Sequence, residues 1–350
     1  MTSSNIGLAI ATAMSLTNVL KDVTAKRVLQ RFDVFAVTFW IRILSALGFT
    51  AVLFAQGIKA TAYIHDGGPL FGIAFLALSP KLVFAIYLLL DVLGVATAVF
   101  LYNRALQISP LSLCAPFLAF TPIFLLGTGA IFLHEMPSWP KAFGAILILV
   151  GSVIMHGDLL RKGLLAPALA IYRDKGTRYS LLTAFLFAIT NPVDKKLVLM
   201  SSAEFQGFVY GIGICIFFGI MVAVKRADWI GVIRSAPLPL ILAGILDCSA
   251  LLLQFLSYRY LDVLVAVSIK RAGIIFAVLM GWLFFHEKNI RLRLLAASTM
   301  FVGVAVMYFI QSVVTSLEIT AAAIVVAAFV WKHSLKNEVI EEPISVSAER

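Results

Sequence analysis

The chain has 350 residues, of which 61% are hydrophobic and 13% are charged, and its mean hydropathy is +0.99. A soluble protein of this length cannot bury so much apolar surface, so the composition predicts a polytopic protein embedded in a lipid bilayer. The net charge of +10 does not indicate nucleic-acid binding, because the basic residues lie mainly in short segments between apolar runs, where they set membrane topology.

Ten apolar runs are predicted to form membrane-spanning helices, each of which needs about 20 residues at about 1.5 Å per residue. In chain order they are Ile6–Val28, Val34–Gln56, Leu82–Leu101, Ser112–Leu133, Ala142–Met155, Ser180–Leu199, Phe205–Val224, Leu238–Leu256, Leu264–Phe285 and Leu294–Ser312. An eleventh run, Leu317–Val330, is shorter, and it is open whether it spans, lies in the interface or frays. The predicted fold class is an all-α polytopic membrane protein with ten transmembrane helices.

Two segments 152 positions apart indicate an internal duplication. Pro116–Glu135 and Ser268–Glu287 share a phenylalanine and glycine pattern and end on the same pair, His134-Glu135 and His286-Glu287. We therefore predict a first five-helix repeat over 1–156, a basic loop over 157–179, a second repeat over 180–312 and a C-terminal segment over 313–350. Because five is an odd number, the second repeat would enter the membrane from the opposite side, as in many secondary transporters.

The stretches AIFLHEMPSWPKAFGAILILVG and WLFFHEKNIRLRLLAASTMFVG each join a fourth helix ending in glutamate to a fifth helix that contains glycine. With two five-helix repeats, this pattern resembles the EamA-type transporters of the drug/metabolite transporter superfamily. The resemblance implies a multi-pass carrier for a small organic solute. We expect this carrier in the inner or plasma membrane. It names neither the solute nor the direction of transport, and both monomer and homodimer stay open.

We predict a secondary transporter that works by alternating access, with possible proton or cation coupling. The alternative is a polytopic membrane enzyme, such as a lipid-linked transferase. The chain has no Walker-type glycine loop, so no coupling to ATP and no ATPase subunit is expected. It also lacks an H-E-x-x-H and a G-x-S-x-G motif, and its three cysteines lack zinc spacing, so no catalytic residue, metal or other cofactor is expected.

Lys270 and Arg271 are the candidate substrate-binding pair. They lie inside the ninth apolar run, where the first repeat has Leu118 and Ala119. Placing an ionisable group inside a bilayer costs about 2.5–3.5 kcal/mol, so such groups usually have a function. We expect the two cations to hold a carboxylate or phosphate, Arg271 with a bidentate grip and Lys270 as a point charge. The alternative is that both extend to the nearer membrane surface.

Two aspartates lie near the centres of corresponding spans, Asp91 in the third and Asp247 in the eighth. One hypothesis makes them a proton or cation relay, because a desolvated carboxyl readily binds a proton. The other is that each neutralises a buried cation, such as Arg42 or Lys270, and holds helices together.

The helix that opens each repeat contains a Thr-Asn step, which predicts an interruption. Broken helices at matching places in two repeats often mark a transporter's binding region, because their backbone groups are available to substrate. The candidates there are Asn18 and Lys21 in the first repeat and Asn191, Asp194 and Lys195 in the second. Alternatively, the lysines mark the boundary between membrane and water.

Other candidates have strong structural alternatives. Tyr102, Gln254 and Tyr258 line a cavity in one hypothesis and anchor helix ends at the interface in the other. Glu135 and Glu287 would gate the pathway at its two mouths, but contacts at helix ends are the favoured interpretation. Pro122 predicts a kink within the fourth span.

The charge distribution predicts the orientation of the chain. Fifteen Lys and Arg residues lie in or directly beside the odd-numbered loops and four in the even-numbered loops, which places the odd loops in the cytoplasm and the N-terminus outside. The resembling family is usually drawn with both termini inside. We predict that a reporter inserted between Gly157 and Thr177 reads as cytoplasmic; a periplasmic signal would reverse the assigned topology.

Overall fold

The computed structural model describes residues 3–29, 31–55, 64–65, 78–108, 117–155, 174–273, 276 and 290–309. Every element within these ranges is a helix, as the composition predicts. The elements are α1 (Ser3–Leu29), α2 (Val34–Ala55), α3 (Pro80–Ile108), α5 (Thr121–Leu133), α6 (Trp139–Met155), α9 (Lys175–Met200), α10 (Ala203–Lys225), α11 (Trp229–Ser235), α12 (Pro237–Ser257), α13 (Val263–Ala272) and α15 (Ile290–Phe309).

Five of the described helices have the length and apolar character of membrane spans. The spanning segments are Asn5–Ala25, Val34–Ala55, Pro80–Tyr102, Ala203–Lys225 and Pro237–Ser257, and three shorter apolar helices are Thr121–Leu133, Trp139–Ile154 and Leu294–Phe309. All of them coincide with predicted spans, so the multi-span helical fold is confirmed, while the number of ten spans stays a prediction. The eleventh run, over 317–330, lies outside the described residues.

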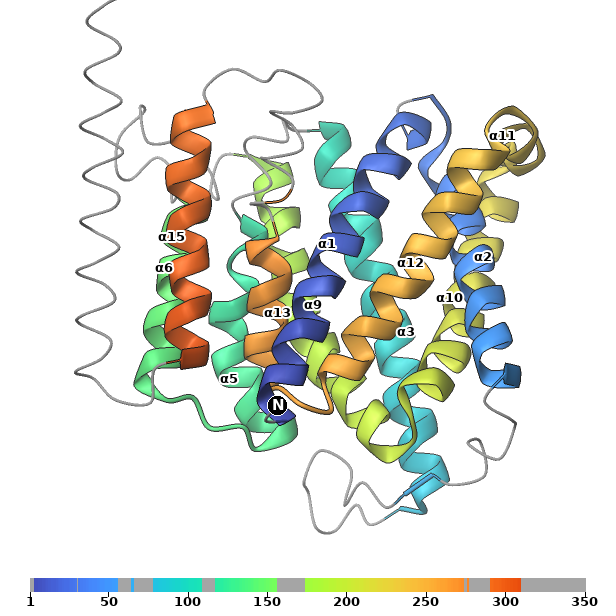
Figure 1. Ribbon diagram of the computed structural model, residues 1–350. Coiled ribbons are helices and arrows are strands. Elements are labelled where there is room, and N and C mark those ends of the chain that lie inside the picture. Colours follow the sequence, from blue (N-terminus) through green and yellow to red (C-terminus); the bar gives the residue numbers. More distant parts are fainter. Residues whose placement is uncertain are drawn as a thin grey trace, which may run out of the picture.

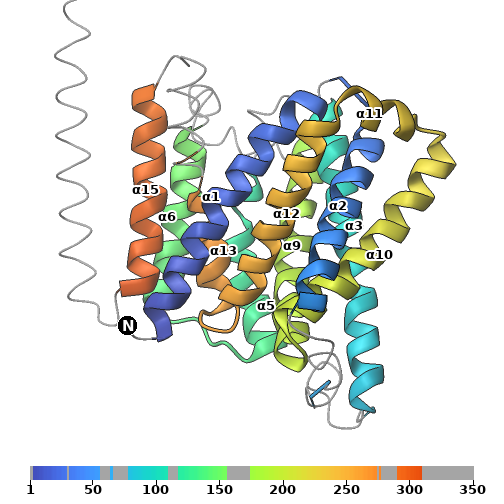
Figure 2. The same cartoon turned by 45° about the vertical axis from the view of Figure 1, so that its right-hand side comes forward.

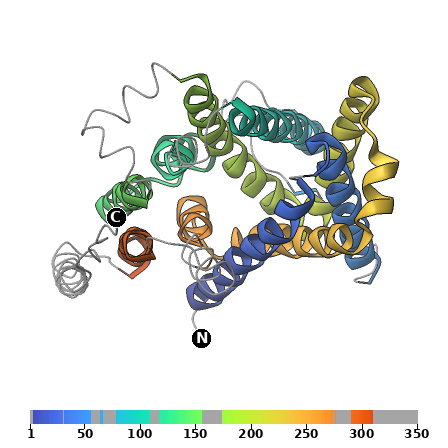
Figure 3. The same ribbon diagram turned by 90° about the horizontal axis from the view of Figure 1, so that it is seen from above.

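The two halves of the chain interlock. Helix α1 packs along α12 and against α13, whereas α9 packs along α3 and α5 (Figures 1 and 2). Seen from above, α6 and α15 lie side by side at one end of the bundle and α2 and α10 at the other (Figure 3). Each of these pairings joins a helix of one half to a helix of the other. The opening helices α1 and α9 consequently lie between the two repeats.

Local sequence signals set the helix starts. The carboxylate of Asp174 accepts a hydrogen bond of 2.6 Å from the Thr177 N–H at the start of α9, and the Ser202 hydroxyl caps α10 in the same way. Pro122 lies in the first turn of α5, after a turn at residues 119–120. Proline is tolerated there because its missing N–H would have no helical partner. Within the predicted fourth span the helix thus breaks at residues 119–120 and restarts beside Pro122, a sharper change than the predicted kink.

Glycines allow α6 and α15 to approach closely. A Cβ atom at Gly303 would lie 2.6 Å from the Gly144 carbonyl oxygen, and a Cβ at Gly151 would lie 2.6 Å from the Ala296 carbonyl oxygen. Real Cβ atoms essentially never come so near to a backbone oxygen. Close backbone contact through small residues is a main source of helix association in membranes, where lipid removes the hydrophobic driving force.

The substitution Gly303→Leu should therefore lower the stability of the purified protein by about 1–3 kcal/mol, because the helices must separate to accommodate the side chain. Gly127→Leu is the matched control, since Gly127 is an exposed helical glycine and a Cβ atom added there would have nothing within 4 Å. The readout is thermal unfolding in detergent. Equal melting temperatures for the two variants would show that the glycine contact does not hold α6 and α15 together.

Candidate functional site

Six polar side chains from the two repeats converge inside the bundle, and we name them the central cluster. They come from α5, α9, α12 with its C-terminal turn, and α13. The members are Thr121, Asn191, Gln254, Tyr258, Lys270 and Arg271. Lys270, Arg271, Asn191 and Tyr258 are substrate-binding candidates from the sequence; hydrogen bonds through Gln254 link Lys270 to Tyr258 and Asn191, and Arg271 contacts Thr121.

A chain of hydrogen bonds links α13 to α9 through α12. The Lys270 ammonium donates to the Gln254 side-chain oxygen at 2.6 Å, and the Gln254 amide donates to the Tyr258 hydroxyl at 2.8 Å. Tyr258 donates in turn to the Asn191 side-chain oxygen at 3.0 Å. Tyr258 is fully buried, so it does not anchor a helix end in the interface. These bonds fix a row of polar groups across the interior of the bundle.

Lys270 and Arg271 diverge from the last turn of α13. Lys270 reaches toward α12, whereas the Arg271 guanidinium donates to the Thr121 hydroxyl at 3.3 Å and lies 5.8 Å from the centre of the Phe187 ring. Neighbouring residues on a helix point about 100° apart, which separates the two cations in this way. Both are half-buried, and both contact neutral groups.

Helix α13, which carries Arg271, ends at a position that matches the start of α5, the helix that carries Thr121. Helix α13 ends at Ala272 with a turn at Gly273, and α5 begins at Thr121 after a turn at 119–120. With the offset of 152 residues between the repeats, Gly273 corresponds to Thr121. Helix α1 also reaches this point, because the Ser15 hydroxyl donates to the Ile269 carbonyl at 3.1 Å. The end of α13 and the start of α5 therefore lie at the junction between the repeats.

The predicted interruptions in the opening helices are wrong, since α1 and α9 are each continuous. Pro192 lies inside α9 and cannot donate to the carbonyl of Ala188. The Thr128 hydroxyl of α5 donates to that carbonyl instead, at 2.6 Å. A freed backbone group in a membrane helix needs such a partner, and here a neighbouring helix supplies it. The carbonyl is thus bonded within the protein and does not face a substrate.

Asp247 lies between two cations. Its carboxylate accepts a hydrogen bond of 2.9 Å from Arg42 and lies 3.7 Å from the ammonium of Lys21. Lys21 also donates to the Asn18 side-chain oxygen at 3.1 Å. The structure therefore places Asn18, Lys21 and Arg42 beside Asp247, outside the central cluster. Of the two alternatives for Asp247, this arrangement agrees with the one in which the aspartate neutralises a buried cation.

Asp91 has a different neighbour from the ones the sequence suggested. It faces Asp194 of α9 rather than Arg42 or Lys270, and the two carboxyls lie within hydrogen-bonding reach of each other. Asp91 is 0% exposed and Asp194 is 5% exposed. The amide of Gln206, a residue the sequence analysis missed, donates to Asp194 at 3.4 Å. Two acids at one buried position were not foreseeable from their separation along the chain.

Lys195 and Glu135 form an ion pair that joins the repeats. Lys195 also donates to the Leu261 carbonyl at 2.7 Å, and the Val263 N–H at the start of α13 donates to Glu135 at 2.9 Å. Lys195 is only 8% exposed, so its ammonium is held inside the bundle, while the alternative that it marks the membrane boundary stays a prediction. Glu135 makes the helix-end contact favoured from the sequence, here between α5, α9 and α13. Its counterpart Glu287 lies outside the described residues.

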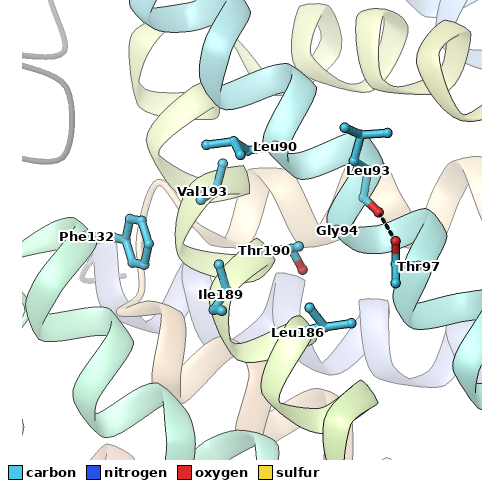
Figure 4. A pocket seen from close by; sticks show the side chains of 9 residues that line it. All are labelled: Leu90, Leu93, Gly94, Thr97, Phe132, Leu186, Ile189, Thr190 and Val193. Atoms are coloured by element: carbon cyan, nitrogen blue, oxygen red, sulfur yellow. Dashed lines mark hydrogen bonds between the residues drawn. The ribbon is translucent and has the colours of Figure 1, made fainter. Parts of the chain in front are cut away.

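A hollow of about 400 Å³ between α3, α5 and α9 is not a polar binding site (Figure 4). The nine residues that line it are uncharged, namely Leu90, Leu93, Gly94, Thr97, Phe132, Leu186, Ile189, Thr190 and Val193. Leu90 and Leu93 are each more than 40% exposed, so the hollow opens to the outside of the bundle. Tyr102 is partly buried further along α3 and is not a member of the central cluster.

The Glu135–Lys195 pair should stabilise the fold. We predict that Glu135→Gln lowers the unfolding free energy by about 1–3 kcal/mol, because Lys195 is left charged in a buried position. Adding Lys195→Gln should restore part of the loss, measured as the coupling energy of a double-mutant cycle. The more exposed Lys141–Asp262 pair is the control, and Asp262→Asn should cost less than about 1 kcal/mol. Equal costs at both sites, or additive effects of the two glutamines, would refute the predicted coupling.

Comparison with known proteins places this architecture in a family. A search of functionally curated proteins gives no match. One crystal structure, described only as that of a protein, shares 14% identity with a TM-score of 0.65, and the match covers 89% of this chain and 99% of the other; it shows that the fold has been observed before. The model of the EamA-like transporter family matches residues 5–156 and again residues 175–309. The chain therefore belongs to the EamA-like transporter family, within the drug/metabolite transporter superfamily of membrane proteins.

Proposed function

We propose that this protein is a secondary transporter of the cell membrane that carries a small anionic metabolite by alternating access. The observation that carries the proposal is the place of Lys270 and Arg271. They extend from the last turn of α13, at the junction where the two repeats meet. In transporters built from two repeats, substrates bind at such a junction, near the middle of the membrane, beside discontinuous helices.

The chemistry of the central cluster favours an anion. Lys270 and Arg271 contribute two positive charges, and the groups to which they donate, the Gln254 side-chain oxygen and the Thr121 hydroxyl, are neutral. The guanidinium can hold a carboxylate or phosphate through two parallel hydrogen bonds, and the ammonium adds a point charge. Asn191 and Tyr258 supply further polar groups for the remainder of a small solute.

Alternating access requires a contact that closes one side of the site and can be broken. The link between Glu135, Lys195 and the start of α13 is suited to this task, because it joins α5 of the first repeat to α9 and α13 of the second. It lies at the end of α13 opposite to Lys270 and Arg271. Movement of one repeat against the other would break these bonds and open the site on that side.

The test is a thermal-shift screen of the purified protein against anionic and cationic metabolites, followed by direct binding of the anions that stabilise it. We predict that Lys270→Gln and Arg271→Gln each weaken binding of such an anion at least about tenfold, the effect of losing one charge-assisted hydrogen bond. Arg271→Lys should also weaken binding, because lysine cannot form the bidentate contact.

Lys225→Gln is the control, since it removes one positive charge at the exposed end of α10 and should leave the affinity unchanged. Two results would contradict the proposal. One is an anion whose affinity is the same in wild type, Lys270→Gln and Arg271→Gln. The other is a screen in which only cationic solutes stabilise the protein.

A further inference from the structure

The duplication provides an internal comparison of two buried acidic sites. The Thr-Asn steps of α1 and α9 are 173 residues apart, and this offset aligns Lys21 with Asp194. Helices α3 and α12 also correspond, and each carries an aspartate at its centre, Asp91 and Asp247. Since α1 packs on α12 and α9 packs on α3, the same pair of positions meets twice in the protein. At the contact between α1 and α12 the pair is Lys21 and Asp247, and at the contact between α9 and α3 it is Asp194 and Asp91.

The two buried carboxylates have neighbours of opposite charge. Asp247 has cations on two sides, Lys21 at 3.7 Å and Arg42 at 2.9 Å. Asp91 faces an acid, and its two carboxyl oxygens accept no hydrogen bond from the described N–H and O–H donors. Two ionised carboxylates in contact repel each other, and neither can donate a hydrogen bond. One proton shared between them removes the repulsion and creates the bond.

The surroundings hold the two acids together and away from water. Asp91 is 0% exposed and Asp194 is 5% exposed. One turn further on, a Cβ atom at Gly94 of α3 would lie 2.6 Å from a methyl carbon of Thr190, so the two helix backbones are close at this point. Neutral Gln206 of α10 donates to Asp194. The titratable groups that act on the acids from the neighbouring helices are Tyr210 of α10, Tyr258 at the end of α12 and Lys270 of α13.

We propose that Asp91 and Asp194 form a proton-binding site that couples proton movement to transport. The inference rests on the proposed function, because the proton is coupled to the anion proposed to bind at Lys270 and Arg271 of the central cluster. With one shared proton the acids carry a single negative charge, which the ammonium of Lys270 attracts. An anion bound at Lys270 and Arg271 offsets that attraction and adds a second negative charge nearby. Binding of the anion therefore favours uptake of a second proton by the acid pair, and the effect is reciprocal, so anion and proton move in the same direction.

The proton site can be tested without any substrate, by infrared spectroscopy of the full chain reconstituted in lipid. A protonated carboxyl gives a C=O stretching band that shifts in D2O. We predict such a band between about pH 5 and about pH 9, where ordinary aspartates stay ionised. The band should vanish in Asp91→Asn and in Asp194→Asn, because the new amide can donate to the remaining carboxylate, which no longer needs a proton.

Asp247→Asn and the exposed Asp33→Asn serve as matched controls, and both should keep the band. If Asp247→Asn does not fold because Asp247 no longer pairs with Arg42, Asp33→Asn still serves as the control. A band that persists in either Asp91→Asn or Asp194→Asn, or is missing from wild type, would overturn the proposal. Loss of the band when sodium chloride replaces choline chloride at constant pH would overturn the proton as the occupant and assign the site to sodium. None of these results depends on the anion affinity of Lys270 and Arg271, so each proposal can fail alone.

Discussion

The structure depends on finding partners for the polar side chains of α9, a helix that lies between the two repeats. A charged or polar group in the interior of an apolar bundle is costly unless it is hydrogen-bonded or neutralised. Asn191, Asp194 and Lys195 follow each other within about one turn and therefore point toward different neighbours. Tyr258 meets the first, Asp91 the second and Glu135 the third. Each of these three residues thus ties α9 to a different segment of the bundle, and the same contacts build the candidate site.

Duplication explains how one bundle came to hold two kinds of buried acid. The packing of an opening helix against a helix of the other repeat occurs twice, so a substitution in one copy changes one of two equivalent contacts. Lysine at position 21 gives an ion pair with Asp247, and aspartate at the matching position 194 gives an acid pair. The fourth helices diverged similarly, since Leu118 and Ala119 stand where the second repeat has Lys270 and Arg271. The framework is shared, and the charges that distinguish the repeats are the ones suited to transport.

Much of this could be predicted from the sequence. Composition and apolar run lengths give the helical membrane fold, and the repeated His-Glu segments match the family assignment. The intramembrane charges identify Lys270, Arg271, Asp91 and Asp247 as candidates. The pairing of Asp91 with Asp194 could not be predicted, because the contact joins residues 103 positions apart and depends on how α3 crosses α9. The interruption predicted for α9 is absent, since a hydroxyl from another helix replaces the hydrogen bond that Pro192 removes. Thr121, at the start of α5, could not be identified as a candidate either, because its contact with Arg271 depends on the packing of α13 beside α5.

The central claim is that the positive charges at the junction of the repeats bind the transported anion. The measurement that tests it most directly is an experimental structure of the protein in lipid with an anion that stabilises it. The account predicts density for the anion within hydrogen-bonding distance of both the Lys270 ammonium and the Arg271 guanidinium, with Asn191 or Tyr258 beside it. Density for the anion away from both cations, with Lys270 still bonded to Gln254 and Arg271 to Thr121, would contradict it.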